Sequence, residues 1–279
     1  MDDDETYLLL LLSDSNLPTG AFVASSGFES YIKHGFGGTR TKTKTRDGDG
    51  DDGTNTVNSK GTERTTAFMS DSVGAYARSA LPFVADAYRV VRGVVIGGDG
   101  DGDLERHLQK IQELDALYDV MTLNHVTKRA SKSQGVALLT LYSKGFSDPS
   151  TSTMASLVSR YKTLVRAQRT PGHLPISWGI LTSALGLTLE RSLYLHTFLH
   201  ARALLSASVR LNEIGPYTAQ RVLAHVARGV IAAEVDRCAC LRTGSGDAGG
   251  LREGPANTWP LGEILAARHD LLHSRIFNS

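Results

Sequence analysis

The stretch "LERHLQKIQELDALYDVM", residues 104–121, decides the fold class. Apolar side chains recur in it at steps of three and four residues, at Leu104, Leu108, Ile111, Leu114, Tyr118 and Met121. A helix of 3.6 residues per turn places all six on one face. The stretch therefore predicts an amphipathic helix that buries one apolar stripe against neighbouring elements.

The same periodicity recurs outward from this stretch. Residues 217–235 carry a stripe of valines, and a last apolar stripe follows Pro260, a residue suited to the first turn of a helix. Helices are also expected within 67–95 and 154–167. No stretch shows sustained alternation of apolar and polar residues between hairpin turns. The sequence thus predicts an all-α protein, a single bundle-like helical domain spanning 1–279.

Three tracts rich in Gly, Asp and Thr interrupt the helical pattern, at 37–66, 97–103 and 243–254. In the first tract Val57 is the only apolar residue. Such a segment cannot offset its own ordering entropy by burial. We expect all three tracts to be disordered loop insertions.

Composition excludes several classes of protein. Of the 279 residues, 41% are apolar and 21% charged, and the net charge is +1, so bulk charge indicates neither a nucleic-acid nor an anionic-membrane partner. The most apolar long window, 189–209, contains two arginines and two histidines and is too polar for a bilayer. The N-terminus is acidic, unlike a signal peptide, and two cysteines make no disulfide framework. We expect a cytoplasmic protein.

Nucleotide and calcium motifs are incomplete. Residues 48–53 and 244–249 match G-x-G-x-x-G, but neither follows a predicted strand. No G-x-x-x-x-G-K-[ST] occurs, so the chain is not itself a P-loop GTPase. The acidic tracts lack the glycine and glutamate positions of an EF-hand loop. No stably bound cofactor is expected.

Two residue pairs are weak candidates for metal ligands. His196 and His200 are four residues apart, so a helix places both imidazoles on one face, but no third ligand is nearby in the sequence. The alternative is a pair of hydrogen-bonded core or interface groups. Cys238 and Cys240 offer two thiols, which by themselves make an incomplete site.

Residues 13–30, "SDSNLPTGAFVASSGFES", combine hydroxyl groups, small residues and one carboxylate. The nucleophile pattern G-x-S-x-G is nearly present around Ser25, but Val23 stands in place of its first glycine and no strand precedes it. The chain offers no set of nucleophile, base and oxyanion donors, so we expect no enzymatic activity. A turn followed by a small-faced helix that approaches another backbone closely fits the composition better.

The segment "LLSDSNLPTGAFVASSGFE" also resembles the opening motif of UreF-type urease accessory proteins, through Leu17, Pro18, Gly20, Phe22, Ser25, Gly27, Phe28 and Glu29. Three further segments resemble that family in the same order along the chain. They carry Arg129, Ser131 and Gly135; then Arg210, Leu211, Gly215 and Gln220; and finally Arg268, His269, Arg275, Phe277 and Ser279. Ser26, Pro216 and Asp270 depart from the family pattern. The insertions suggest a eukaryotic version, with a fungal one as a candidate.

The resemblance implies an all-α, non-catalytic protein of urease maturation, commonly a homodimer. A protein of this type bridges a UreD/UreH-type partner and a UreG-type GTPase and regulates GTP-dependent insertion of nickel into apo-urease, so nickel is handled by the complex. The C-terminal segment is expected to dock into the UreD/UreH-type partner. Residues expected to contact partners are Leu17, Pro18, Gly20, Phe22, Gly27, Glu29, Arg129, Ser131, Arg210, Gln220, Arg268, His269, Arg275, Ile276, Phe277 and Ser279.

Individual roles within this set remain hypotheses. Ile276 and Phe277 would act as buried anchors, while Arg268 and Arg275 would pair with partner carboxylates or lie on a solvated helix face. Arg210 and Gln220 are either interface groups or an internal polar pair between adjacent helices. An alternative function is a metallochaperone that carries nickel on its own His196/His200 or Cys238/Cys240 ligands.

Overall fold

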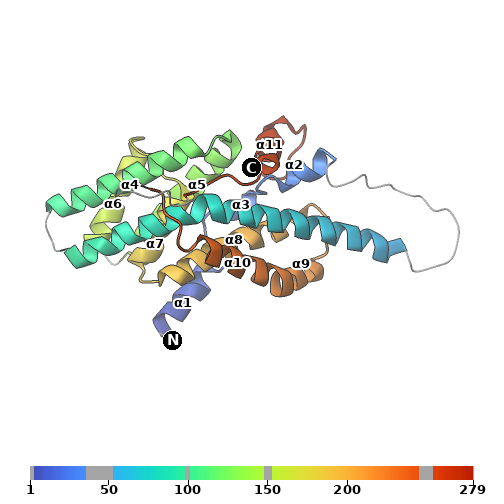
Figure 1. Ribbon diagram of the computed structural model, residues 1–279, viewed down its shortest axis with the longest axis horizontal. Coiled ribbons are helices and arrows are strands. Elements are labelled where there is room, and N and C mark those ends of the chain that lie inside the picture. Colours follow the sequence, from blue (N-terminus) through green and yellow to red (C-terminus); the bar gives the residue numbers. More distant parts are fainter. Residues whose placement is uncertain (1–2, 36–52, 98–100, 148–152, 245–253, 279) are drawn as a thin grey trace.

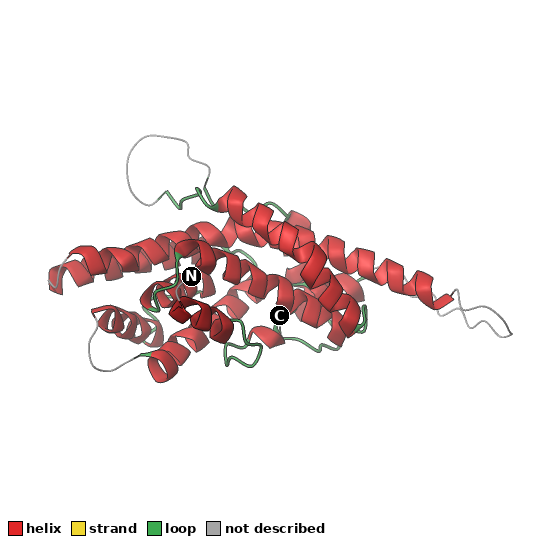
Figure 2. Ribbon diagram, turned by 90° about the horizontal axis from the view of Figure 1, so that it is seen from below, coloured by secondary structure: helices red, strands yellow, loops and turns green. Residues whose placement is uncertain are grey.

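The computed structural model describes residues 3–35, 53–97, 101–147, 153–244 and 254–278, and in these ranges it contains helices and loops but no strand (Figure 2). The all-α prediction is confirmed. The elements are α1 (Asp3–Leu12), η1 (Ala21–Val23), α2 (Phe28–Lys33), α3 (Gly53–Gly97), α4 (Asp101–Met121), α5 (His125–Leu141), η2 (Tyr142–Phe146), α6 (Thr153–Arg166), α7 (Leu174–Ala184), α8 (Leu189–Arg210), α9 (Pro216–Val222), η3 (Leu223–Ala227), α10 (Arg228–Cys238), α11 (Pro260–Ala267) and η4 (Arg268–Leu271).

The long helix α3 is the spine of the bundle and runs along the longest axis of the molecule (Figure 1). Its fully buried side chains include Met69, Val73, Leu81 and Val84. Helices α4, α7, α8 and α10 pack against it. The core therefore forms around α3, and α7, which is buried over nearly its whole length, lies inside the bundle.

The apolar stripe of residues 104–121 forms α4 as predicted. Five of its six side chains are buried. The exception is Met121, which is 37% exposed because it is the last residue of the helix. The other expected helices also form, and α11 begins at Pro260.

The prediction of disorder is wrong for residues 53–66, the second half of the tract 37–66. Residues 53–66 form the first part of α3. Thr65 there is only 2% exposed, and Arg64 Nη2 lies 2.7 Å from Glu213 Oε2. A count of apolar residues misses this contact, because it is a hydrogen bond between charged side chains that are far apart in the sequence. Residues 36–52 lie outside the described residues.

The shorter tracts are also partly structured. Residues 101–103 form the first turn of α4, and Thr243 donates its backbone N–H and its hydroxyl to Asp86 Oδ2, at 2.9 and 2.8 Å. Residues 98–100 and 245–253 lie outside the described residues. Within the described ranges no helix is long and apolar enough to cross a bilayer.

Gly135 is a position where only glycine fits. A Cβ atom on it would lie 2.0 Å from the carbonyl oxygen of Gly172, so α5 touches the backbone of the loop before α7. Gly135→Ala is expected to lower the free energy of unfolding by about 1–3 kcal/mol through overpacking. Urea denaturation measures this change.

The matched control is Gly229→Ala in α10, where no atom lies within 4 Å of the added Cβ. This change is expected to raise the free energy of unfolding by about 0.5–1 kcal/mol, because alanine loses less backbone entropy in a helix. Equal effects of the two substitutions would contradict the close approach at Gly135.

Candidate functional site

The N-terminal motif forms a turn, the short η1 and the start of α2. Gly27 has φ +85°, and a Cβ on it would lie 3.2 Å from Ala266 Cβ, so the start of α2 lies directly against α11. Ser25 is fully buried, and its hydroxyl accepts the backbone N–H of Glu29 at 3.4 Å. The serine is thus a local structural group, and α2 projects Glu29 toward the C-terminal end of the chain.

Glu29 is a fully buried carboxylate that binds the C-terminal end. Its oxygens accept the backbone N–H groups of Ile276 at 2.8 Å and Phe277 at 3.1 Å. Lys33 Nζ lies 3.0 Å and His269 Nε2 3.2 Å from the same carboxylate. Burial alone would raise the pKa of the Glu29 carboxyl, but these donors together hold it below its usual value. Glu29 is therefore ionised, and it fixes residues 272–278, which we call the C-terminal strap.

Asp270 is a second centre of contacts at the same end of the bundle. Arg129 of α5 binds its two oxygens at 3.0 Å each, Arg275 Nη1 lies at 2.6 Å and His125 Nε2 at 3.1 Å. The Arg129 guanidinium holds the pKa of the Asp270 carboxyl well below its usual range. Arg129 also donates to the carbonyl oxygen of Asn278 at 3.2 Å. The strap is thereby joined to α5 as well as to α2.

Phe277 packs the strap against the rest of the protein. Its ring is 2% exposed, and the Arg210 guanidinium, at the end of α8, stacks 4.4 Å from the ring centroid. The backbone N–H of Asn278 donates to the carbonyl oxygen of Val23 at 2.9 Å. In Figure 1 the C-terminal end lies accordingly beside α2 and α11. Four segments that are far apart in the sequence thus meet at the strap.

The structure brings together ten of the residues that sequence predicts as partner contacts, but it gives them different exposures. Glu29, His269 and Phe277 are buried within their own chain, whereas Phe22 is 62% and Ile276 59% exposed. The hypothesis that Phe277 anchors a partner therefore does not describe this arrangement, in which its ring fills its own fold. The ten residues are Gly20, Phe22, Gly27, Glu29, Arg129, Arg210, His269, Arg275, Ile276 and Phe277.

The remaining predicted contacts lie elsewhere. Ser131 is buried, where its oxygen accepts the N–H of Leu174 and lies 3.1 Å from His173 Nδ1, so it joins α5 to α7. Leu17 and Pro18 lie in the turn before η1, Arg268 is exposed, and Ser279 lies outside the described residues. Gln220 is exposed on α9. Arg210 stacks on Phe277 and does not pair with Gln220.

Asp270 and Lys33 hold the strap but are absent from the contacts that the sequence predicts. In the sequence Asp270 stands out only as a departure from the family pattern, although it binds Arg129, Arg275 and His125. Lys33 could have been found, because a cation four residues after a glutamate on a helix is a recognised pair.

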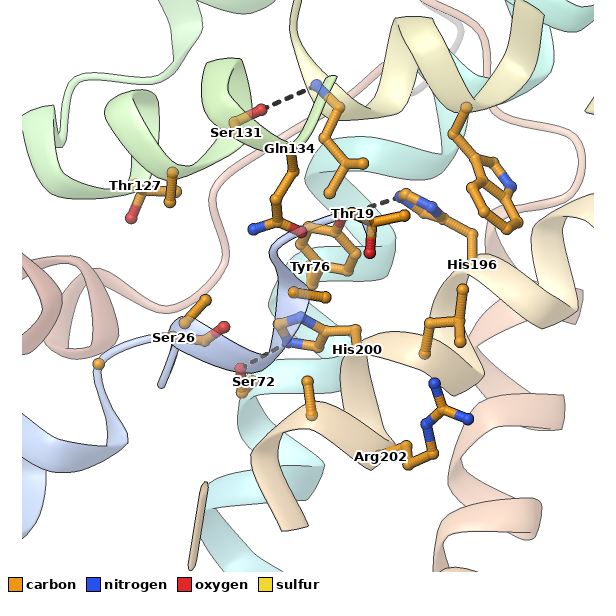
Figure 3. Close-up of a pocket in the computed structure, with 18 of the residues that line it drawn as sticks. Thr19, Ser26, Ser72, Tyr76, Thr127, Ser131, Gln134, His196, His200 and Arg202 are labelled. Carbon is orange, nitrogen blue, oxygen red and sulfur yellow. Dashed lines mark hydrogen bonds between the residues drawn. The ribbon is translucent and has the colours of Figure 1, made fainter. Parts of the chain in front are cut away.

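A cavity of about 630 Å³ lies beneath the N-terminal segment, between α3, α5 and α8 (Figure 3). His196 and His200 line it, and both imidazoles stack on the ring of Tyr76, with centroids 5.3 and 4.1 Å away. His196 Nε2 lies 2.8 Å from the Tyr76 hydroxyl, and His200 Nε2 lies 3.0 Å from the Ser72 hydroxyl. These contacts fit the alternative of hydrogen-bonded core histidines.

Neither candidate metal pair forms a ligand set. No three His, Cys, Asp or Glu side chains gather around a common point within the described residues. Burial lowers the pKa of His196 to about 3 and that of His200 to about 4, so both are neutral. Cys238 is buried, which raises the pKa of its thiol, whereas Cys240 is exposed. The two thiols therefore lie in different environments.

Comparison with known proteins gives one family throughout. The UreF family model matches residues 60–227. Urease accessory protein 6 of Cryptococcus neoformans var. grubii is 42% identical over 311 aligned residues, which cover 99% of this chain and 97% of that protein. An uncharacterized urease accessory protein UreF-like of Schizosaccharomyces pombe is 29% identical, with 99% and 97% covered. UreF of Arthrobacter sp. is 28% identical, with 98% of each chain covered.

Glu29→Gln tests the attachment of the strap. The amide keeps the size of the side chain but loses the negative charge and one acceptor oxygen, so we expect the strap to loosen by about 2–3 kcal/mol. Digestion by a carboxypeptidase, followed by mass spectrometry, should remove the C-terminal residues at least tenfold faster than in the unaltered protein. Asp71→Asn, at an exposed position of α3, is the control. Equal digestion of all three proteins would show that Glu29 does not hold the strap.

The lowered pKa values of His196 and His200 determine how stability depends on pH. The unfolded chain binds protons at these side chains near pH 6.5, whereas folded His196 and His200 stay neutral down to about 3 and 4. Stability is therefore fully present above pH 6.5 and falls as the pH is lowered below that value. His196→Phe should reduce the loss between pH 7 and pH 5 by about 2 kcal/mol.

Urea denaturation at the two pH values measures this loss. His225→Gln, which replaces an exposed histidine, serves as the control substitution. An unchanged pH dependence in His196→Phe would contradict a neutral, buried His196.

Proposed function

The chain belongs to the UreF family of urease accessory proteins, and on that premise we propose that it is a non-catalytic scaffold of urease maturation. It bridges a UreD/UreH-type partner and a UreG-type GTPase and regulates GTP-dependent insertion of nickel into apo-urease. The proposal includes a cytoplasmic homodimer that binds no cofactor stably, with nickel handled by the complex.

The observation that carries this proposal is the convergence of the family-like segments on the C-terminal strap. Their ionisable groups, Glu29 and Asp270 foremost, bind one another and the backbone of the strap. Such paired groups build a contact surface. The arrangement favours a contact surface over a catalytic centre.

The C-terminal segment presents side chains that suit the UreD/UreH-type partner. Ile276 is 59% and Leu271 71% exposed, and Arg268 and Arg275 are exposed as well. Exposed apolar residues flanked by arginines are typical of interface anchors. We therefore assign this face to the UreD/UreH-type partner.

The alternative of a nickel-carrying metallochaperone is less well supported. Both imidazoles of the histidine pair stack on Tyr76 and hydrogen-bond through Nε2, and the thiols differ in exposure. Equilibrium dialysis of the purified chain with nickel decides between the two functions, and one ion bound per chain would favour the alternative.

Pull-down of the UreD/UreH-type partner tests the assignment of the C-terminal face. Deletion of residues 268–279 is expected to abolish binding, and Ile276→Asp, which changes one exposed side chain, should weaken it about tenfold. Leu10→Asp on α1, also exposed, is the matched control. Unchanged binding by the deletion variant would contradict the assignment.

Deletion of the gene in its host tests the function as a whole. Urease activity should be lost, or restored only by excess nickel, and reintroducing the gene should recover it. Intact urease activity without the gene would reject a role in urease maturation.

A further inference from the structure

A surface hollow lies between the strap, η1 and α5. Val23, Arg129, Gln134, Arg275 and Phe277 are among the residues that line it. The strap forms one wall, so the hollow exists only while the strap is seated on the body of the protein. Its other walls come from the N-terminal motif and from α5, the segments that carry the family resemblance.

Positive charge exceeds negative charge around this hollow. Two guanidiniums, of Arg129 and Arg275, share the single carboxylate of Asp270, to which His125 also binds. Glu29 does not correct the imbalance, because it is fully buried and is matched by Lys33 at 3.0 Å. One arginine charge at the hollow thus lacks an anion of its own among the residues that the structure describes.

Arg210, beside Phe277 of the hollow, adds a second cation that has no anion of its own within the described ranges. Its guanidinium stacks 4.4 Å from the centroid of Phe277 and lies 6.0 Å from that of Phe22, and in the described part of the chain it forms no ion pair. Partial burial lowers the pKa of Arg210, so part of its hydration has been lost without a compensating anion. A stacked guanidinium is also pre-oriented for a carboxylate.

Exposed apolar side chains lie next to these cations. Phe22 is 62% exposed and Ile276, the neighbour of Arg275 in the strap, is 59% exposed. Arginine and aromatic residues at the centre of a patch are the composition of interaction hot spots. The surface therefore combines unmatched positive charge with apolar contact area.

We propose that the hollow and Arg210 together bind an acidic segment of a partner protein, with carboxylates for the guanidiniums and an apolar side chain between them for Phe22 and Ile276. The inference builds on the proposed function, in which partners assemble on this chain, and it specifies the chemistry of one of them. It also requires the strap to stay seated in the complex, because the strap supplies one wall and supports Arg210 through Phe277.

A fluorescein-labelled peptide with two glutamates flanking a phenylalanine serves as the probe. Fluorescence anisotropy should show saturable binding that weakens as salt rises, because exposed charge pairs are screened. Replacing both glutamates of the peptide by glutamine should abolish binding. Arg210→Gln should weaken binding about tenfold, Arg210→Lys nearly as much, and Phe22→Ala several-fold.

Arg221→Gln, at an exposed position of α9, has the same charge change and should bind as the unaltered protein does. Carboxypeptidase resistance of each variant checks that its strap is still seated. With the strap intact, equal affinity of the Arg210 and Arg221 variants, or equal affinity for the glutamate and glutamine peptides, would overturn the proposal. Binding of inorganic phosphate with an affinity like that of the peptide would also overturn it, since a general anion site would then explain the data.

The outcome separates this inference from the proposed function. Loss of urease activity in the gene deletion together with normal peptide binding by Arg210→Gln would refute the acidic-segment site alone. Intact urease activity in the deletion would refute the maturation role, whatever the peptide result.

Discussion

A buried carboxylate joins the two ends of this protein. Glu29 is removed from solvent and keeps its negative charge, which costs several kcal/mol unless donors surround it. Two backbone N–H groups of the strap, Lys33 and His269 supply those donors. The position of Phe277, the stacking of Arg210 and the hollow beside Arg129 all depend on the strap that Glu29 holds.

Helices and their buried stripes could be predicted from sequence because periodicity is a local property. The stripe from Leu104 to Tyr118 and the helix opening at Pro260 need no knowledge of the rest of the fold. Residues 53–66 could not be predicted in this way. Within them Arg64 contacts Glu213, which is far away in the sequence, and composition does not reveal such a contact.

Most residues of the candidate site could be predicted from the sequence, but their arrangement in space could not. Family-like segments pointed to Glu29, Arg129, Arg210 and Phe277, yet nothing in the sequence indicated that they meet. Sequence predicts Phe277 as an anchor buried in a partner, whereas the structure buries its ring in its own chain and binds its backbone N–H to Glu29. For His196 and His200 the sequence leaves open a ligand pair or core histidines, and the stacking of Tyr76 on both imidazoles fits the second interpretation.

The N-terminal segment separates two environments of opposite character. On one side lies the cationic hollow by the strap, and on the other the cavity with its neutral imidazoles, and Ala24 and Gln134 line both. Small side chains such as Ala24 keep this partition thin. Ser25 of the segment is accordingly a packing group, because it is fully buried and its hydroxyl accepts the backbone N–H of Glu29.

The most direct test of this account is amide hydrogen exchange at Ile276 and Phe277, measured by NMR on the full chain. Both amides donate to Glu29, so they should exchange at least a hundredfold more slowly than in an unstructured peptide, consistent with about 3 kcal/mol of local stability. Exchange at the rate of an unstructured peptide would mean that the strap is free and that Glu29 does not join the two ends.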